Sequence, residues 1–375
     1  MRIGIEAQRI FRKSKHGMDM VALELIKQLQ IIDDKNEYFI FVNNYDDFHA
    51  LPKVTNFNIV KVNFSPYPLW EQYYLPKAVK DTGVELLHCT SNTSPTTIDV
   101  PLILTLHDII YLEKWNFTAG TSYQILGNLY RRWNVPIAVK LASHIITVSD
   151  FEKEKIKRYF KFNDDQVSTA YNGVGKHFKT ITDKEELLRT KKLYNLPDDF
   201  MFFLGNTDPK KNVIGVLRAL SIIKQKGLLK SKLVMFDINR EFLNGIMKQI
   251  NDNTLIDDIV FCDYVPNTDL PAIYSQAKLF LYPSLRESFG IPLLEAMACG
   301  TPIITSNTSS MPEVADNAAF FINPFEPIEI ANAIIELQSN QSKCDELILN
   351  GKKRVEHFTW KENAQQTIEI YNKYS

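Results

Sequence analysis

The most informative segment of the chain runs Tyr282-Pro283-Ser284-Leu285-Arg286-Glu287-Ser288-Phe289-Gly290-Ile291-Pro292-Leu293-Leu294-Glu295-Ala296-Met297-Ala298-Cys299-Gly300. Its pattern predicts the end of an apolar strand, then a short loop, then a helix. Proline near the first helical position and glycine just past the last one both favour that helix. Backbone N–H groups at such a helix N-terminus point outward and can bind a phosphate or another anion. The groups concerned belong to Ser288, Phe289, Gly290 and Ile291.

Two carboxylates accompany this loop. Glu287 lies within it, and Glu295 lies about one turn into the helix. A carboxylate can accept two hydrogen bonds from a vicinal diol such as a ribose, and a loop carboxylate can contact a transferred sugar. The alternative interpretation makes Glu287 a solvated loop residue and Glu295 a charge that stabilises the helix dipole.

Outward from this segment, strand patterns alternate with longer helical patterns. Strands are expected near residues 2–7, 38–43, 57–63, 84–90, 101–106, 144–148, 167–171, 201–205, 232–237, 259–263, 279–283, 302–305 and 319–322. Helices are expected near residues 17–30, 69–80, 121–142, 150–160, 209–226, 240–251, 268–277, 291–299 and 326–338. The alternation predicts an α/β fold whose parallel sheets carry helices on both faces. The segment 174–200 interrupts it as a linker with a polar helix, so 375 residues are expected to form two domains.

A second polar segment, Gly205-Asn206-Thr207-Asp208-Pro209-Lys210-Lys211-Asn212, follows the strand expected at 201–205. Asp208 suits a helix N-cap and Pro209 suits the first helical turn. Lys210 and Lys211 would then lie at the positive end of the helix dipole, which is unfavourable for a cation. A diphosphate bound at this strand end explains both lysines. The alternative is a pair of solvated lysines.

Other candidates also lie where strands end, at the edge where open α/β sheets bind ligands. His107 can donate to a sugar hydroxyl or a phosphate, or relay a proton, and Asp108 can orient it or bind the acceptor. The alternative is a satisfied histidine under a loop. Gly17-Met18 opens a helix like a glycine loop, although one glycine is a weak signal.

Apolar residues of the first half allow two interpretations. An acceptor groove or simply the core would contain Met18, Tyr67, Trp70, Tyr73, Tyr74 and Trp115. The segment 123–141, within the helix expected near 121–142, mixes aromatic and basic residues. It would either rest on an anionic membrane surface or only cover the sheet as an amphipathic helix.

The bulk composition excludes several classes of protein. The formal net charge of -1 provides no long-range field for a nucleic-acid backbone, so no nucleic-acid partner is expected. The four cysteines have no metal-ligand spacing and indicate reduced thiols. The N-terminus lacks a signal-peptide pattern, and no apolar run reaches about eighteen residues, so we expect a cytoplasmic protein.

Taken together, these residues resemble the family 4 glycosyltransferases of GT-B fold. Glu287 and Glu295 form a Glu-x7-Glu motif, which continues to Pro302. Further motifs in the expected order are Trp70-Glu71-Gln72, Leu75-Pro76, Thr105-Leu106-His107-Asp108, Val148-Ser149, Asn172-Gly173-Val174, Lys211-Asn212 and Pro312-Glu313-Val314. The resemblance implies two Rossmann-like domains facing each other across a cleft. These are an acceptor domain at 1–180, a nucleotide-sugar-binding domain at 181–357, and a terminal helix at 358–375 that crosses back.

The resemblance also implies a retaining hexosyl transfer from a nucleoside-diphosphate sugar, with no metal or other cofactor. Glu295 would hold the ribose, and Glu287 with the amides of residues 288–290 would contact the donor sugar. Lys211 would neutralise the departing diphosphate, and His107 would contact the donor sugar near the reacting carbon. The motif contexts favour mannose or a related sugar. The expected acceptor is a saccharide or lipid-linked saccharide for surface polysaccharide, with peripheral membrane contact.

Two departures from the family pattern keep other classes open. Asn206 stands where the family often has arginine, and Lys210 would substitute for it. The glycine loop is reduced to Gly17, which with Met18, Asp108 and Trp70 is expected to face the acceptor. The alternatives are a sugar-nucleotide epimerase of similar fold and a non-catalytic subunit.

Overall fold

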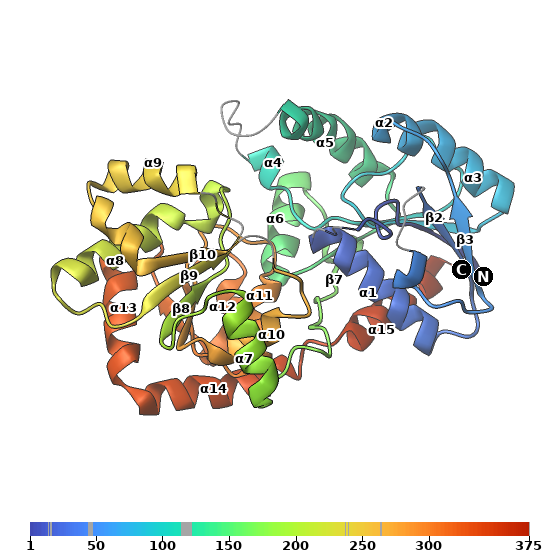
Figure 1. The fold of residues 1–375 in the computed structure, drawn as a ribbon. Helices are drawn as coiled ribbons and strands as arrows, with labels where there is room; N and C mark the ends of the chain where they lie inside the picture. Colours follow the sequence, from blue (N-terminus) through green and yellow to red (C-terminus); the bar gives the residue numbers. More distant parts are fainter. Residues whose placement is uncertain are drawn as a thin grey trace. The chain divides into compact units, whose positions relative to one another are not determined.

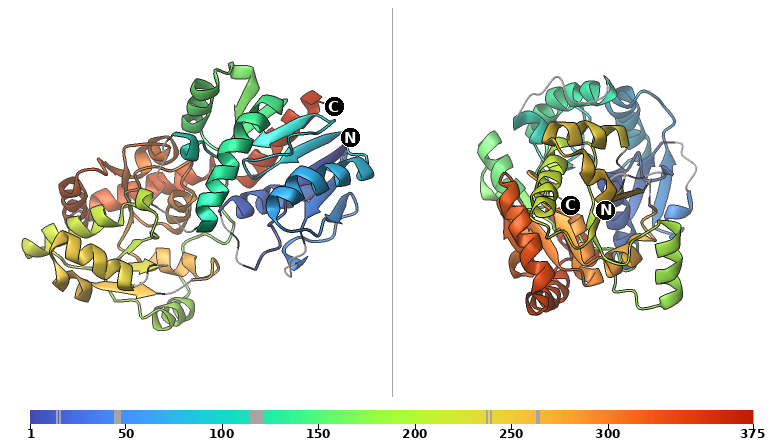
Figure 2. Two further views of the ribbon diagram at one scale, coloured as in Figure 1. Left: turned by 90° about the horizontal axis from the view of Figure 1, so that it is seen from above. Right: turned by 60° about the vertical axis from the view of Figure 1, so that its left-hand side comes forward.

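The computed structural model describes residues 1–13, 15, 17–43, 48–113, 122–236, 238, 240–262 and 265–374, without the side chains of residues 48, 122–125 and 262. The chain forms two compact units, which are described separately. Unit 1 comprises Met1–Asn172 and Trp360–Ser375, and unit 2 comprises Gly173–Thr359. In each unit helices cover a parallel sheet (Figures 1 and 2), which confirms the predicted α/β class.

Unit 1 contains a seven-stranded parallel sheet with the order β3-β2-β1-β4-β5-β6-β7. Its strands are β1 (Arg2–Glu6), β2 (Glu37–Val42), β3 (Phe57–Lys61), β4 (Leu86–Cys89), β5 (Leu102–Thr105), β6 (His144–Thr147) and β7 (Val167–Thr169). Its helices and helical turns are α1 (Gly17–Ile32), η1 (Phe48–Ala50), α2 (Tyr67–Leu69), η2 (Trp70–Tyr74), α3 (Leu75–Thr82), α4 (Ile110–Glu113), α5 (Ser122–Leu141), α6 (Asp150–Phe160), η3 (Asp164–Gln166), α15 (Trp360–Tyr371) and η7 (Asn372–Tyr374). Strands β4, β5 and β6 are buried along their whole length, as a sheet covered on both faces requires.

The last helix, α15, belongs to unit 1 although unit 2 precedes it in the chain. It packs against α1, and its residues Ala364, Ile370 and Tyr371 join the apolar core around that helix. The hydroxyl of Tyr371 lies 2.6 Å from Nδ1 of His88 in β4. The end of the chain is thus fixed to the sheet by both apolar and polar contacts.

Unit 2 contains a six-stranded parallel sheet with the order β10-β9-β8-β11-β12-β13. Its strands are β8 (Phe200–Phe203), β9 (Lys232–Phe236), β10 (Ile259–Cys262), β11 (Leu279–Tyr282), β12 (Ile303–Ser306) and β13 (Phe320–Ile322). Its helices and helical turns are α7 (Lys184–Leu193), η4 (Pro209–Lys211), α8 (Val213–Gln225), α9 (Arg240–Ile250), η5 (Asn253–Asp258), α10 (Leu270–Gln276), α11 (Ile291–Cys299), α12 (Met311–Ala315), η6 (Asp316–Ala318), α13 (Pro327–Ser339) and α14 (Gln341–Val355). Helix α11 ends where Gly300 takes a left-handed conformation at φ 76°, which glycine adopts without strain.

The helices α4, α12 and α14 were not expected, and one expected helix is split in two. The helix expected at 209–226 is split, because Asp208 caps the 3₁₀ turn η4 and α8 begins only after Asn212, whose φ is 62°. The 15-residue helix α14 was not expected, because its sequence is mostly polar and buries only Cys344, Leu347 and Gly351. Its few apolar contacts become visible only once α11 and α13 lie beside it.

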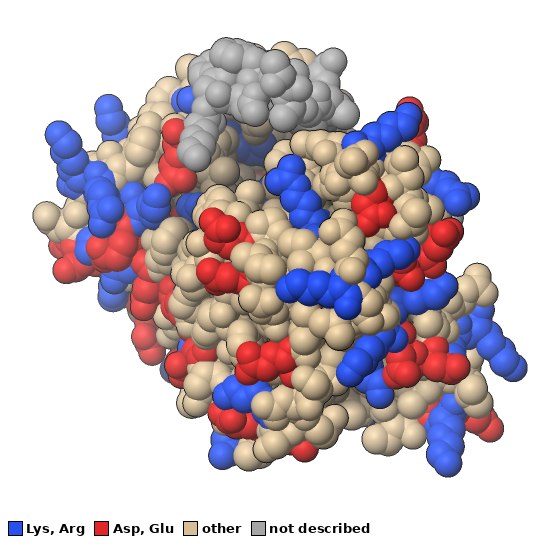
Figure 3. Space-filling model, turned by 90° about the vertical axis from the view of Figure 1, so that its left-hand side faces the viewer, with Lys and Arg blue, Asp and Glu red and all other residues tan. Residues whose placement is uncertain are grey.

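The surface and the helices agree with the balanced composition. Figure 3 shows basic and acidic side chains interspersed over one face of the molecule, as the net charge of -1 implies. Within the part of the chain that the structure describes, none of the helices has the length and apolar content needed to cross a bilayer.

Candidate functional site

The two predicted polar segments of unit 2 meet at the middle of its sheet. Strands β8 and β11 are neighbours, and the chain leaves them toward opposite edges of the sheet. In open α/β sheets this switch point is where ligands bind, outside the carboxyl ends of the strands. The loops after the two strands touch directly, because the Leu285 N–H donates to the Lys210 carbonyl at 2.7 Å.

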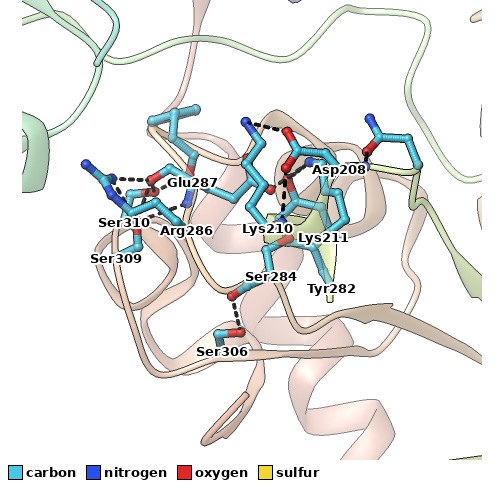
Figure 4. A network of polar contacts seen from close by, with 12 residues as sticks. Asp208, Lys210, Lys211, Tyr282, Ser284, Arg286, Glu287, Ser306, Ser309 and Ser310 are labelled. Carbon is cyan, nitrogen blue, oxygen red and sulfur yellow. Dashed lines mark hydrogen bonds and ion pairs between the residues drawn. The ribbon is translucent and has the colours of Figure 1, made fainter. Parts of the chain in front are cut away.

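An ion pair joins the two loops at this point. Nζ of Lys211, in η4, lies 2.6 Å from Oε1 of Glu287, in the loop after β11 (Figure 4). The same ammonium group donates to the hydroxyl of Tyr282 at 3.3 Å and lies 5.1 Å from the centre of its ring. An ammonium group has three N–H donors, so a third can reach a phosphate oxygen while these two contacts persist.

Burial and charge act in opposite directions on Glu287. Burial by itself would raise its pKa, but the positive charges of Lys211 and Lys210, together with hydrogen bonds from Lys211 and Ser284, outweigh burial, so the pKa lies below its usual value. Glu287 is therefore ionised at neutral pH and is 8% exposed, which leaves a charged oxygen within reach of a ligand.

The second carboxylate of the motif, Glu295, is also in place. It projects from α11, and the hydroxyl of Tyr274 donates to its Oε2 at 3.0 Å. Burial raises the pKa of Glu295 to about 7, against the opposing effect of the Tyr274 hydrogen bond. Burial also raises the pKa of Tyr282 far above its usual value, and the charges of both Glu287 and Glu295 raise it further. Both carboxylates therefore lie close enough to act on one phenol.

Serine hydroxyls at and after the end of β12 form hydrogen bonds to the backbone of the loop between β11 and α11. Ser306 donates to the Ser284 carbonyl at 2.6 Å (Figure 4). Oγ of Ser310 lies 3.1 Å from the Glu287 carbonyl oxygen and 2.9 Å from the Phe289 carbonyl oxygen, so its single hydrogen is shared between them. These bonds occupy carbonyl oxygens of the loop. The loop then enters α11 through Gly290, which has φ 102° and no side chain that could cap the helix. The arrangement presents a helix N-terminus whose backbone is fixed in advance.

The other predicted donor-site residues occupy the loop after β8. Asn206 is exposed, and its Oδ1 accepts the Asp208 N–H at 2.9 Å, so its side chain shapes the turn. Nζ of Lys210 lies 3.7 Å from Oδ2 of Asp208. Both side chains of this long ion pair are partly exposed, so the Lys210 ammonium group can exchange Asp208 for another anion. A Cβ on Gly205 would come within 2.1 Å of the Phe203 ring, which restricts this position to glycine.

The histidine candidate lies in unit 1, just after β5. His107 is buried, and its Nε2 lies 3.0 Å from the Thr90 carbonyl oxygen. A carbonyl can only accept, so Nε2 carries the hydrogen and Nδ1 of the neutral ring is an acceptor. Burial lowers the pKa of His107, against opposing effects of the Thr90 bond and of Asp108. Oδ1 of Asp108 accepts the Ile110 N–H at 3.1 Å, so this carboxylate shapes the turn into α4.

The remaining predicted acceptor residues are divided between core and surface. Trp70 has no exposed surface, and its indole N–H donates to the Val62 carbonyl at 2.6 Å. A side chain buried in this way cannot contact an acceptor, so Trp70 is a core residue and its predicted role is corrected. Gly17 is exposed and Met18 is partly exposed at the start of α1. Trp115 lies outside the described residues.

Sequence reasoning missed the residues that support the charged groups. Tyr282 contacts Lys211, and Tyr274 contacts Glu295. Ser310 bonds to the backbone of the loop between β11 and α11. In the sequence, Tyr282 lies in an apolar strand pattern and Tyr274 lies in a helical pattern, so neither is marked as a polar contact of the site. The hydroxyl run Thr308-Ser309-Ser310 was a visible signal, because it follows the strand beside the motif.

Comparisons with known proteins match both halves of the chain. The family model described as "Glycosyl transferases group 1" matches residues 184–354, and that described as "Glycosyltransferase Family 4" matches residues 16–176. O-antigen chain mannosyltransferase B of Escherichia coli is 25% identical over 370 residues, which cover 95% of either chain. Serotype-specific mannosyltransferase WbdA of Escherichia coli is 28% identical over 235 residues, which cover 62% of this chain but 29% of WbdA.

A solved structure extends the similarity to the whole fold. The crystal structure of Alr3699/HepE from Anabaena, in complex with UDP and glucose, matches with a TM-score of 0.75. The match covers 100% of both chains at 17% sequence identity, so it is a likeness of fold.

Proposed function

Because this chain belongs to the family 4 glycosyltransferases and has the GT-B fold, we propose that it transfers a mannosyl residue from a nucleoside-diphosphate donor. The proposed acceptor is a saccharide of a surface polysaccharide, carried on a lipid. Two relatives named as mannosyltransferases, one of them an O-antigen chain enzyme, support this choice of sugar and acceptor. The proposed reaction retains the anomeric configuration.

The Lys211–Glu287 pair is the observation that carries the proposal. In the transfer, the bond from the anomeric carbon to the diphosphate oxygen breaks as the acceptor oxygen bonds to that carbon, and the proton of the acceptor hydroxyl leaves with the diphosphate. Negative charge therefore collects on the diphosphate. We assign the neutralisation of this charge to Lys211 and to the N–H groups at the start of α11, which need no metal ion.

The remaining polar groups suit the rest of a sugar nucleotide. An ionised Glu295 can accept both hydroxyls of a ribose, as a carboxylate has two acceptor oxygens. We assign the second carboxylate oxygen of Glu287 to a hydroxyl of the transferred sugar. His107 offers Nδ1 as an acceptor for a sugar hydroxyl.

A panel of nucleotide sugars tests the proposal. We expect the intact protein to bind a nucleoside-diphosphate mannose, to hydrolyse it slowly, and to keep this activity in the presence of a chelator. The melting temperature of the protein should rise when the nucleoside diphosphate alone is added, because a ligand that binds only the folded state stabilises that state. Release of a free epimerised sugar nucleotide without acceptor, or no shift with any nucleotide, would refute the proposed transfer.

A further inference from the structure

Glu71 and Gln72 of η2 belong to a motif of the family, and neither has a role in the site described so far. Glu71 has no exposed surface, so its carboxylate cannot contact a substrate. Its Oε1 accepts the hydroxyls of Tyr67 at 2.6 Å and Thr93 at 2.5 Å. Its Oε2 accepts the hydroxyl of Tyr130 and lies 3.1 Å from Nε2 of Gln72. A buried carboxylate needs such donors around it, and in return it fixes the side chains that donate.

Gln72 also binds the loop that follows β4, residues 90–96. Its Oε1 accepts the N–H of Thr96 at 2.9 Å and the hydroxyl of Thr96 at 2.8 Å. Its Nε2 lies 3.0 Å from the Ser94 carbonyl oxygen. Asn134 of α5 holds the same residue, because its side chain accepts the Ser94 N–H at 3.1 Å and donates to the Ser94 carbonyl at 2.8 Å. Two helical segments, η2 and α5, therefore fix the backbone of this loop.

The same loop holds His107, which follows β5. The His107 N–H donates to Oδ1 of Asn92 at 2.6 Å, and Nε2 of its ring lies 3.0 Å from the Thr90 carbonyl oxygen. Asn92 has φ 69°, a left-handed conformation that residues other than glycine keep only when their surroundings impose it. The next residue is Thr93, whose hydroxyl donates to Glu71. The buried carboxylate thus anchors the loop one residue away from the side chain that binds His107.

We propose that Glu71 and Gln72 are positioning residues of the transfer reaction, which hold His107 through the loop after β4. The inference rests on the proposed function, in which His107 accepts a hydrogen bond from a sugar hydroxyl. A neutral imidazole ring can carry its hydrogen on either nitrogen, and only the form with the hydrogen on Nε2 leaves Nδ1 as an acceptor. The Thr90 carbonyl selects this form while the loop keeps its place.

Substitutions in the loop contacts test this proposal in the full chain. Thr93→Val removes the hydroxyl that binds Glu71 at nearly constant volume, and Gln72→Met removes the amide contacts with the loop. In both variants, NMR of isotope-labelled histidine should show the His107 ring changing from the Nε2–H form to a mixture of both tautomers. Thr93→Ser keeps the hydroxyl and should restore the wild-type ring signals.

Kinetics provide the second readout. The kcat of transfer should fall about tenfold in Thr93→Val and in Gln72→Met, which is the contribution expected of His107. The affinity for a nucleoside diphosphate, which is assigned to unit 2, should not change in either variant. Thr93→Ser should regain most of the lost kcat. A role confined to folding would predict neither this division between kcat and affinity nor the change in the His107 ring.

A matched control separates positioning from a general loss of stability. Tyr38→Phe removes a buried hydroxyl that donates to a carboxylate, as Thr93→Val does, here to Oδ2 of Asp33 at 2.6 Å. Tyr38 lies near the start of β2, at the opposite edge of the parallel sheet from the loop after β4. This variant should leave the His107 ring signals and the kcat unchanged.

The possible outcomes are distinct. Wild-type ring signals of His107 in both Thr93→Val and Gln72→Met would overturn the proposal, whatever the kcat. So would an equal fall in kcat in Tyr38→Phe, since the effect would then follow stability and not position. Mixed tautomers with full kcat would overturn the role of His107 in the proposed function, and with it any effect of the network on transfer. The NMR readout needs neither donor nor acceptor, so it separates failure of this proposal from failure of the proposed function.

Discussion

The ammonium nitrogen of Lys211 lies 2.6 Å from Oε1 of Glu287, and this pair ties together the loops that follow the two central strands of unit 2. The side chains are only 16% and 10% exposed. Water therefore screens their interaction little, and each charge depends on the other for compensation. The same dependence predicts how the protein responds when either partner is removed.

Replacing Lys211 with methionine leaves the Glu287 carboxylate buried without its cation. We expect a loss of about 3 kcal/mol in the free energy of unfolding and a fall in transfer rate of about 10²-fold or more. Urea unfolding and initial rates measure the two effects. The double variant Lys211→Met/Glu287→Gln should regain stability but not activity. Turnover near the wild-type level in Lys211→Met would exclude this lysine from the reaction.

The affinity for a nucleoside diphosphate should depend on pH through Glu295. The pKa of Glu295 in the folded protein is about 7, against an ordinary 4.5. The ionised form of its side chain, which accepts a ribose diol, is therefore fully populated only when the pH rises above about 7. Affinity by titration calorimetry should increase over this range, and in Glu295→Gln it should be weak and flat. The Tyr274 hydrogen bond lowers the pKa of Glu295 in the wild type. Tyr274→Phe removes this bond, so the midpoint of the affinity curve should move to higher pH. An unchanged midpoint in this variant would contradict the assignment.

The same raised pKa fixes the sign of a stability effect. Between pH 4.5 and about 7 the folded protein retains a proton on Glu295 that the unfolded chain has released. The free energy of unfolding contributed by this group therefore falls as the pH rises through that window. Glu295→Gln should remove this part of the slope in urea unfolding at several pH values. Identical slopes for variant and wild type would show that the group titrates normally.

His107 should act as a neutral hydrogen-bond acceptor throughout the neutral range. Its lowered pKa means that the folded protein binds fewer protons than the unfolded chain as the pH falls below 6.5. Its contribution therefore reduces stability on acidification, and His107→Asn should weaken that acid sensitivity. Activity should fall about 10-fold or more in His107→Ala and less in His107→Asn, whose amide oxygen can replace Nδ1. Equal activity of the two variants would argue against an acceptor role.

Ser310→Ala should loosen the loop between β11 and α11. The hydroxyl is fully buried and shares its one hydrogen between two loop carbonyls, so its removal withdraws a buried donor from the loop and costs about 1 kcal/mol. Donor affinity should weaken because the N–H groups at the start of α11 lose their fixed orientation. Ser339→Ala, at the exposed end of α13, is the matched control and should change neither quantity. Full donor affinity in Ser310→Ala would show that the loop needs no such support.

Local patterns were enough to identify the candidate residues of unit 2. Proline and glycine at the ends of α11, and the conflict between two lysines and a helix dipole, are visible within a few residues of sequence. The helix boundary near Lys211 was wrong because Asn212 takes a left-handed conformation, which ends η4 before α8 starts. Trp70 was misassigned because a groove and a core both require apolar residues on one side of a helix.

The sequence by itself determined the α/β class, the order of the strands, and the presence of a carboxylate pair beside a helix N-terminus. Only the tertiary structure decided that Lys211 meets Glu287, 76 residues away, and that Tyr282 touches the same ammonium group. The physical reason is the separation along the chain over which each kind of interaction acts. Periodicity and capping act between residues a few positions apart, whereas the partner of a buried charge depends on which strands become neighbours in the sheet.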